Sequence, residues 1–272
     1  MKIRRPYVAG SFYPANKDKL KKMIEDFLNN VKEYKKRKNF FAFISPHAGY
    51  PYSGQVAARV YNEIEEIKDV NKIILLGVSH NAIFDYAAID GNDEWETPLG
   101  KVLCDKEIIE ELLEEKIFKI DSSCHDIEHS LEVQVPFIQV VKKDVRIVPI
   151  LIGSSNLNFL RKVADKLFEI YNKDKFILIA SSDMYHGYSY EECVNYDERT
   201  RNIILEIDHE KFYKAIDKEA MACGAYAITA LLRFCELLKD VKAEVLDQTN
   251  SARVTYSYHG YVVGYLSMGF YK

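Results

Sequence analysis

The chain has 272 residues, 48% of them hydrophobic, and a formal net charge of −4, which is enough material for a sizeable core. We expect one domain over residues 1–272 and no nucleic-acid partner, because the acidic balance provides no basic field for phosphates. No stretch is apolar enough to span a bilayer or to act as a signal core, so we expect no membrane association and a cytoplasmic location.

The hydrophobic period changes along the chain. Residues 17–34 carry apolar side chains three and four apart, which is typical of an amphipathic helix. Two further helices of this kind are predicted at 56–67 and 157–171. Runs that are apolar at nearly every position alternate with them and indicate strands buried in a largely parallel sheet, hence an α/β layered fold. These runs are 40–45, 72–78, 145–151 and 175–181.

The remaining segments give weaker signals. Residues 86–103 combine turn residues with the only tryptophan and predict a hairpin-like excursion. Pro149 cannot donate to a sheet ladder, so the run 145–151 is expected near an edge or at a bulge. In the C-terminal third, the pattern predicts helices and then strands of the same sheet. The helices are expected near 190–206 and 222–238, and the strands at 241–246, 252–258 and 261–270.

Polar side chains follow three of the four apolar runs. In an open parallel sheet the carboxyl ends of the strands form the crevice in which ligands bind. Each of these side chains alone fits an ordinary turn equally well, but their coincidence at three strand ends favours a shared site. They are His47, His80, Asp183 and His186.

Two histidines with a carboxylate are the donor set of non-haem iron sites, and such donors also serve zinc or copper. Since His186 follows Asp183 by three residues, both can face one cavity. We expect one of the two to bind a metal and the other to support a ligand or act as an acid/base.

One cysteine has a distinctive setting. The five cysteines show no CxxC and no paired spacing, which argues against a disulfide framework and a structural zinc knuckle. Cys223 comes just before the predicted helix core, where the helix dipole favours a thiolate, a strong ligand for borderline metals. A small buried hydrophobe is an equally good interpretation of it. The other four are interpreted as structural: Cys104, Cys124, Cys193 and Cys235.

The stretch "CHDIEHSLEVQVPF" gathers ionisable residues before an apolar helix that Pro136 should end or kink. A capped helix start and a contact with the site are equally good interpretations. His129 and Glu132 are predicted to share a helix face, while roles for His125 and Glu128 stay open. Elsewhere, His259 is expected in a turn and His209 on the surface.

Several motifs in order resemble the Memo family, called in archaea and bacteria the AmmeMemoRadiSam system protein B. The resemblance runs from near residue 5 to the C-terminus. It implies a single domain with the fold of class III extradiol ring-cleaving dioxygenases, a central mixed sheet with helices on both faces. The motifs are "RPYVAGSFYP", "SPHAGYPYSG", "GVSH", "EHSLEVQVPF", "SSDMYH", "MACG" and "SARVTYSYHGYVVGYLS".

By this resemblance, His47, His80 and Cys223 occupy the metal-ligand positions, and Asp183 and His186 line the pocket. Iron is the implied metal, with copper also proposed for the family. The dioxygenases complete their set of metal ligands with a carboxylate, whereas this site offers an oxidisable thiolate. The resemblance in fold therefore does not by itself imply ring cleavage.

Three functional hypotheses follow. The first is a metal-dependent redox protein in which Asp183 completes the site and His186 serves as acid/base. The second is extradiol-type dioxygenation of a small aromatic compound, with His186 as the base. The third is a pocket that binds a peptide or protein without turnover, and the family resemblance implies radical-SAM and AMMECR-type proteins as partners.

Overall fold

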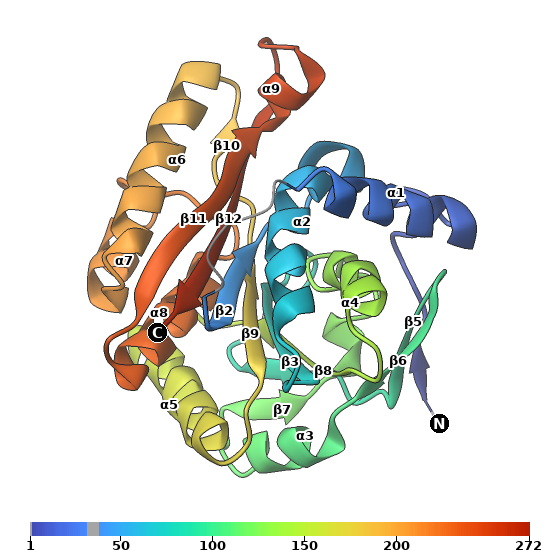
Figure 1. Cartoon of the computed structure of the whole chain (residues 1–272). Helices are drawn as coiled ribbons and strands as arrows, with labels where there is room; N and C mark the ends of the chain where they lie inside the picture. The colour runs from blue at the N-terminus through green and yellow to red at the C-terminus, as the bar shows by residue number, and fades with distance from the viewer. Residues whose placement is uncertain (1, 32–37) are drawn as a thin grey trace.

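Four parallel strands form the centre of the sheet. The computed structural model describes residues 2–31 and 38–272, and Figure 1 shows their arrangement. In spatial order the central strands are β8 (Arg146–Ile152), β3 (Lys72–Val78), β9 (Ile177–Ser181) and β2 (Phe40–Ser45). All of their residues except some terminal ones are buried. The four strands predicted from apolar runs are therefore confirmed within two residues at each end.

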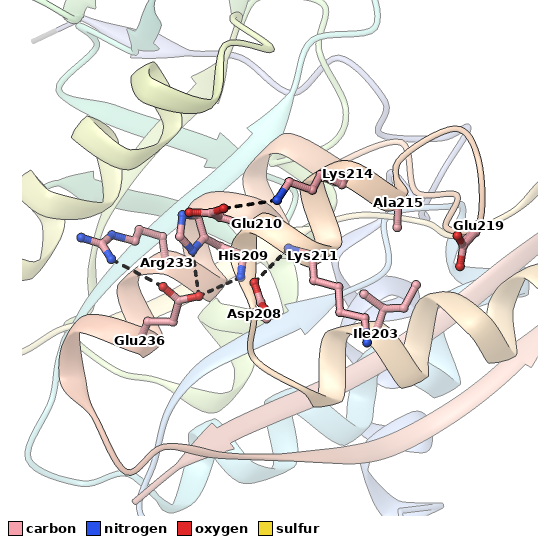
Figure 2. Close-up of a pocket in the computed structure, with 10 residues that line it drawn as sticks. All are labelled: Ile203, Asp208, His209, Glu210, Lys211, Lys214, Ala215, Glu219, Arg233 and Glu236. Atoms are coloured by element: carbon pink, nitrogen blue, oxygen red, sulfur yellow. Dashed lines mark hydrogen bonds and ion pairs between the residues drawn. The ribbon is translucent and has the colours of Figure 1, made fainter.

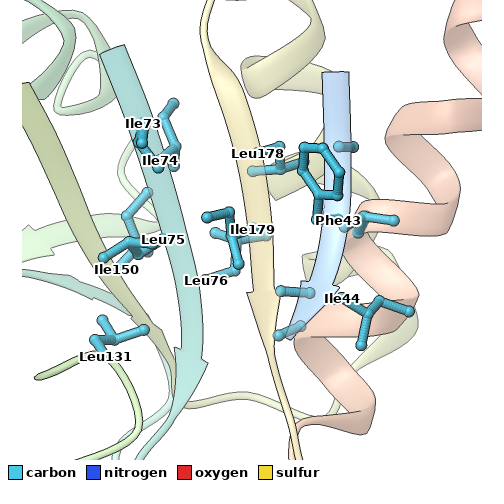
Figure 3. Close-up of a cluster of buried hydrophobic side chains, with 14 of the residues drawn as sticks. Phe43, Ile44, Ile73, Ile74, Leu75, Leu76, Leu131, Ile150, Leu178 and Ile179 are labelled. Carbon is cyan, nitrogen blue, oxygen red and sulfur yellow. The ribbon is translucent and has the colours of Figure 1, made fainter. Parts of the chain in front are cut away.

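These strands carry the main hydrophobic core. Because both of their faces are covered, their side chains are apolar on both faces. Figure 3 shows part of this core, in which Phe43, Leu76 and Ile179 come from three different strands and are fully buried.

Antiparallel strands on both sides make the sheet mixed. On one side, β12 (Val262–Tyr271) pairs with β2, and both β10 (His186–Gly187) and β11 (Lys242–Asn250) pair with β12. On the other side, β5 (Glu94–Thr97) and β6 (Gly100–Cys104) form the predicted hairpin, which joins β8 through β6. β4 (Ala87–Ile89) also pairs with β8, and the outer strands there are β1 (Ile3–Arg4), next to β5, and β7 (Phe118–Ile120), next to β4.

Helices cover both faces of the sheet. The connection from β2 to β3 through α2 (Tyr50–Glu66) crosses the sheet in one direction, and that from β8 to β9 through α5 (Leu157–Lys173) crosses in the other. Since parallel crossovers are right-handed, α2 and α5 lie on opposite faces. The predicted α/β fold, with a mixed, mainly parallel sheet between helices, is confirmed. The other long helices are α1 (Lys17–Asn29), α6 (Tyr190–Leu205) and α8 (Ala225–Leu238).

Side-chain caps fix where several helices begin. The side chains of Asn16, Asn156 and Ser189 each accept a hydrogen bond from the backbone N–H three residues on, starting α1, α5 and α6. α2 begins at Tyr50, earlier than predicted, because a proline at its second position needs no N–H partner. The helix predicted to residue 34 ends at Asn29, and residues 32–34 of that prediction lie outside the described part.

Two predictions of local secondary structure were wrong. Instead of a strand at 252–258, the chain forms α9 (Ser251–Thr255), whose first turn is capped when the Asn250 side chain accepts from the Arg253 N–H. Pro136 does not end a helix but stands in the first turn of α4 (Val135–Val141), where its missing N–H costs nothing.

Pro149 lies inside the sheet, not at an edge. β8 pairs with β3 on one side, and on the other with β6 up to Ile147 and with β4 from Ile150. The Pro149 carbonyl accepts from the Asp90 N–H on that second side. Its nitrogen therefore faces the gap between two partner strands, and no ladder bond is lost.

Short elements were not predicted, because each has too few residues for a hydrophobic period. These include α3 (Lys106–Leu112), α7 (His209–Ala215), and single-turn 3-10 helices at Ser122–Cys124 and Glu132–Gln134. Over the described ranges, no helix has the length and apolar character needed to cross a membrane.

Candidate metal centre

A cavity of about 500 Å³ opens at the carboxyl ends of the parallel strands. β2, β3 and β9 each end within two residues of a side chain that lines it. Its polar lining includes His47, His80, His129, Asp183 and His186. Its apolar and aromatic lining includes Phe12, Tyr52, Tyr261, Val263 and Tyr265.

Three histidines converge at this cavity. One ring nitrogen of each of His47, His80 and His129 lies within 4.8 Å of the other two. The His80 and His129 rings stack with centroids 4.5 Å apart, and both meet the His47 ring edge-on. The His47 residue is only 2% exposed, whereas the His80 side chain is 33% exposed, so the group runs from the buried end of the cavity to its mouth.

The buried carboxylate of Glu128 orients two of these rings. It accepts from the His80 backbone N–H (2.5 Å) and Nδ1 (2.9 Å), and it lies 3.4 Å from Nδ1 of His129. Burial raises the pKa of Glu128, but the hydrogen bonds from His80 and Ser130 outweigh it and hold that pKa at about 2. A carboxylate only accepts, so Nδ1 of His80 carries a proton, and in the neutral form of the ring the lone pair is on Nε2.

Asp183 joins the ends of β2 and β9. Its Oδ1 accepts from the backbone N–H groups of His47 (2.7 Å) and Ala48 (3.3 Å). Burial raises the pKa of Asp183 to about 7, although these two amides oppose the shift. Burial, reinforced by the neighbouring His129 and His80, lowers the pKa of His47 well below its usual value, which keeps that ring neutral.

Cys223 faces His47 from another part of the chain. Its Sγ lies 3.1 Å from Nε2 of His47 and accepts from the Asp183 N–H at 3.2 Å. Burial and the nearby Asp183 raise the pKa of the Cys223 thiol to about 12, so without a metal it is protonated. The prediction that the helix dipole favours a thiolate there was wrong, because burial outweighs the dipole.

Gly224 permits this approach. A Cβ there would stand 2.5 Å from the Ser181 carbonyl oxygen and 2.8 Å from Cβ of Ser182, so only glycine lets α8 begin against the end of β9.

His186 occupies the side of the cavity formed by β10. Its Nδ1 lies 2.9 Å from the Met184 carbonyl oxygen, which can only accept, so Nδ1 carries the proton and Nε2 is an acceptor. Burial lowers the pKa of His186, so the ring is neutral at pH 7.

The N-terminal segment is fixed against the cavity by a buried ion pair. Glu132 accepts from Arg4 Nη1 (2.7 Å), the Tyr7 and Val8 N–H groups (2.8 and 2.9 Å) and the Tyr13 hydroxyl (2.6 Å). The same segment places Phe12 against His129, with ring centroids 4.7 Å apart. Glu132 thus faces Arg4, and the prediction that it shares a helix face with His129 was wrong, because His129 precedes the 3-10 turn in a loop.

A second cavity, drawn in Figure 2, lies between α7 and α8. His209 is 5% exposed there, so the prediction of a surface residue was wrong. Its Nδ1 lies 2.7 Å from Glu236, and its Nε2 accepts from Nε of Arg161 at 3.0 Å. Although Asp208, His209 and Glu236 are close enough to hold an ion, both ring nitrogens of His209 are engaged, and we interpret the group as an ion network between helices.

All five residues singled out from the sequence lie at the first cavity or in contact with a residue that lines it. His47, His80, Asp183 and His186 line the cavity, and Cys223 contacts His47. His129 and Glu128, left open between capping and a site contact, have direct contacts there. Phe12 was missed, and the only signal for it was the N-terminal motif. His125 is buried away from the cavity, where its ring Nε2 donates to the Ala88 carbonyl, and His259 is exposed in a bend.

The family model and the similar proteins by sequence indicate one family. Residues 4–269 match the family model described as Memo-like protein. Proteins named "MEMO1 family protein" are similar in Archaeoglobus fulgidus (35% identical, 98% of this chain and 99% of the relative) and Nitrosopumilus maritimus (34%, 93% and 94%). An uncharacterized protein from Escherichia coli K12 shares the fold at 12% identity, with a TM-score of 0.55 over 83% of this chain and 99% of its own. The chain belongs to the Memo family.

Proposed function

We propose that this protein binds a transition metal, redox-active in the case of iron or copper, at the carboxyl ends of its central strands. Iron is the metal we expect first, with copper and zinc as alternatives, and His47, His80 and Cys223 are the proposed ligands. The observation that carries the proposal is the convergence of the His47, His80 and His129 ring nitrogens within 4.8 Å. The Cys223 sulfur lies outside that group of three but is 3.1 Å from Nε2 of His47.

The donor chemistry fits such an ion. Imidazole and thiolate together suit iron, copper and zinc better than the hard cations magnesium and calcium. Neutral histidines are the binding form, and a coordinated thiol loses its proton to the metal's charge. His129 supplies a further nitrogen that either completes the set or faces an incoming ligand. A bound ion would contribute Lewis acidity or one-electron chemistry at the buried end of the cavity.

Two other side chains would handle protons. Asp183, whose pKa burial raises to about 7, can hold or release a proton beside the cavity near neutral pH. His186 presents an unprotonated Nε2, which suits a general base.

Metal analysis of protein purified without oxygen tests the proposal. We expect bound metal in the wild type and its loss in the double variant His47→Ala/His80→Ala and in Cys223→Ala. His209→Gln and Cys235→Ala are matched controls, since each changes a buried residue of the same type outside the cavity. Equal metal content in all of these proteins would contradict the proposal.

The cavity lining supports a second candidate, dioxygenation of a small aromatic compound. Phe12, Tyr52 and Tyr261 provide aromatic surface beside the histidines, and His186 would take a proton from a substrate hydroxyl. Iron-loaded protein would be supplied with catechol-type compounds and oxygen. A ring-cleaved product absent from His186→Gln would support this function, and no product across a broad panel would rule against it.

A further inference from the structure

A chain of buried hydrogen bonds lies behind His47, on the side away from the cavity. Nδ1 of His47 is 3.1 Å from Oγ of Ser181, and that hydroxyl is 2.6 Å from the Ser130 carbonyl oxygen. Nε2 of Gln134 donates to the Ser181 Oγ (2.8 Å) and to the Pro46 carbonyl (3.0 Å). All of these side chains are at least 98% buried.

The far end of the chain fixes the orientation of the Gln134 amide. The Tyr61 hydroxyl donates to Oε1 of Gln134, while the Pro46 carbonyl can only accept. The nitrogen of Gln134 must therefore face Pro46 and Ser181.

This orientation of the Gln134 amide determines which atoms donate and which accept at Ser181 and His47. The single hydroxyl proton of Ser181 goes to the Ser130 carbonyl, which has no proton to give. One lone pair of Ser181 is taken by Gln134, so only a lone pair remains for His47. Nδ1 of His47 must then be the donor, and Nε2, 3.1 Å from the Cys223 sulfur, must be the unprotonated nitrogen.

From this geometry we infer that Ser181 and Gln134 are positioning residues that hold His47 in the Nδ1–H tautomer, with its Nε2 lone pair presented to the cavity before any ligand arrives. In the opposite tautomer Ser181 would have to donate to Nδ1 and leave the buried Ser130 carbonyl without a donor, which disfavours that form roughly 5- to 150-fold. The tautomer stands independently of the metal, whereas its consequence for metal affinity rests on the proposed function.

Nitrogen NMR of the metal-free protein tests the tautomer directly. In protein labelled with ¹⁵N-histidine, and with the His47 signals assigned by their loss in His47→Gln, we expect a protonated Nδ1 and an unprotonated Nε2. A proton on Nε2 of His47 in the wild type would overturn the inference, and this measurement requires no variant at Ser181 to fold. Ser181→Ala should move the population towards the Nε2–H form.

The matched control is Ser45→Ala. Ser45 is the register partner of Ser181 on the neighbouring strand and is equally buried; its hydroxyl lies beside that of Tyr61 at the far end of the chain and makes no hydrogen bond to Ser181, Gln134 or His47. Ser45→Ala should leave the His47 tautomer unchanged.

Zinc titration provides the second readout. Loss of a partner that orients a histidine ligand typically weakens metal binding roughly 10- to 100-fold, so Ser181→Ala should bind Zn²⁺ that much more weakly than Ser45→Ala. If the wild type binds Zn²⁺ and the Ser181→Ala and Ser45→Ala variants bind it with equal affinity, the positioning role is overturned. If the wild type shows the expected tautomer but binds no metal, the proposed function fails while the assigned tautomer holds.

Discussion

Glu132→Gln should destabilise the protein strongly, because it removes the charge that compensates a buried arginine. The side chains of Arg4 and Glu132 are each 1% exposed, and the carboxylate accepts from four donors. Glutamine keeps the shape but turns an N–H towards one pair of those donors and leaves the cation unpaired. Breaking a buried pair in this way costs about 3–5 kcal/mol.

Urea unfolding followed by circular dichroism measures the change. The matched control is Glu96→Gln, which breaks the ion pair of Glu96 with Arg5, whose side chain is 70% exposed. An exposed pair contributes less than about 1 kcal/mol, so the control should unfold close to the wild type. If Glu132→Gln lost no more stability than Glu96→Gln, with an unchanged m value, our account of the N-terminal anchor would be refuted.

Three further predictions concern other parts of the fold. Burial raises the pKa of Asp197 to about 6, although the hydrogen bond from the Tyr185 N–H opposes this shift. The contribution of the protonated Asp197 to stability is therefore complete at low pH and is lost as the pH rises from about 4 to 6. In unfolding experiments Asp197→Asn should gain about 2–3 kcal/mol relative to the wild type between pH 4 and 7, and a pH-independent difference would contradict this. Gly224→Ala should cost about 1–3 kcal/mol in the same assay, because its Cβ would clash with Ser181 and Ser182; an unchanged midpoint would count against the close contact. His129→Gln should weaken Zn²⁺ binding roughly 10-fold or more if His129 is a ligand, and calorimetry showing wild-type affinity would exclude it from the set.

The sequence predicts the centre of the sheet well, because buried parallel strands leave an unmistakable run of apolar residues. The same runs locate His47 and His80, since the polar side chains that follow a buried parallel strand lie at the crevice. Local signals were sufficient for these residues.

Residues fixed by long-range contacts were harder to predict. His129 reaches the cavity from a loop whose position depends on Glu128 and on the ion pair between Arg4 and Glu132, which are 128 positions apart in the chain. His209 lies in a polar stretch, but its burial comes from packing between α7 and α8. No hydrophobic period records such contacts, so neither environment could be predicted locally.

The position of β12 has a consequence for synthesis on the ribosome. This strand is synthesised after the other strands of the sheet, yet it pairs with β2, which precedes it by more than 200 positions. Until residues 262–271 leave the exit tunnel, β2 presents an open hydrogen-bonding edge that can join other unfinished chains. Truncated translation products of this protein should therefore aggregate or be degraded instead of accumulating as soluble fragments.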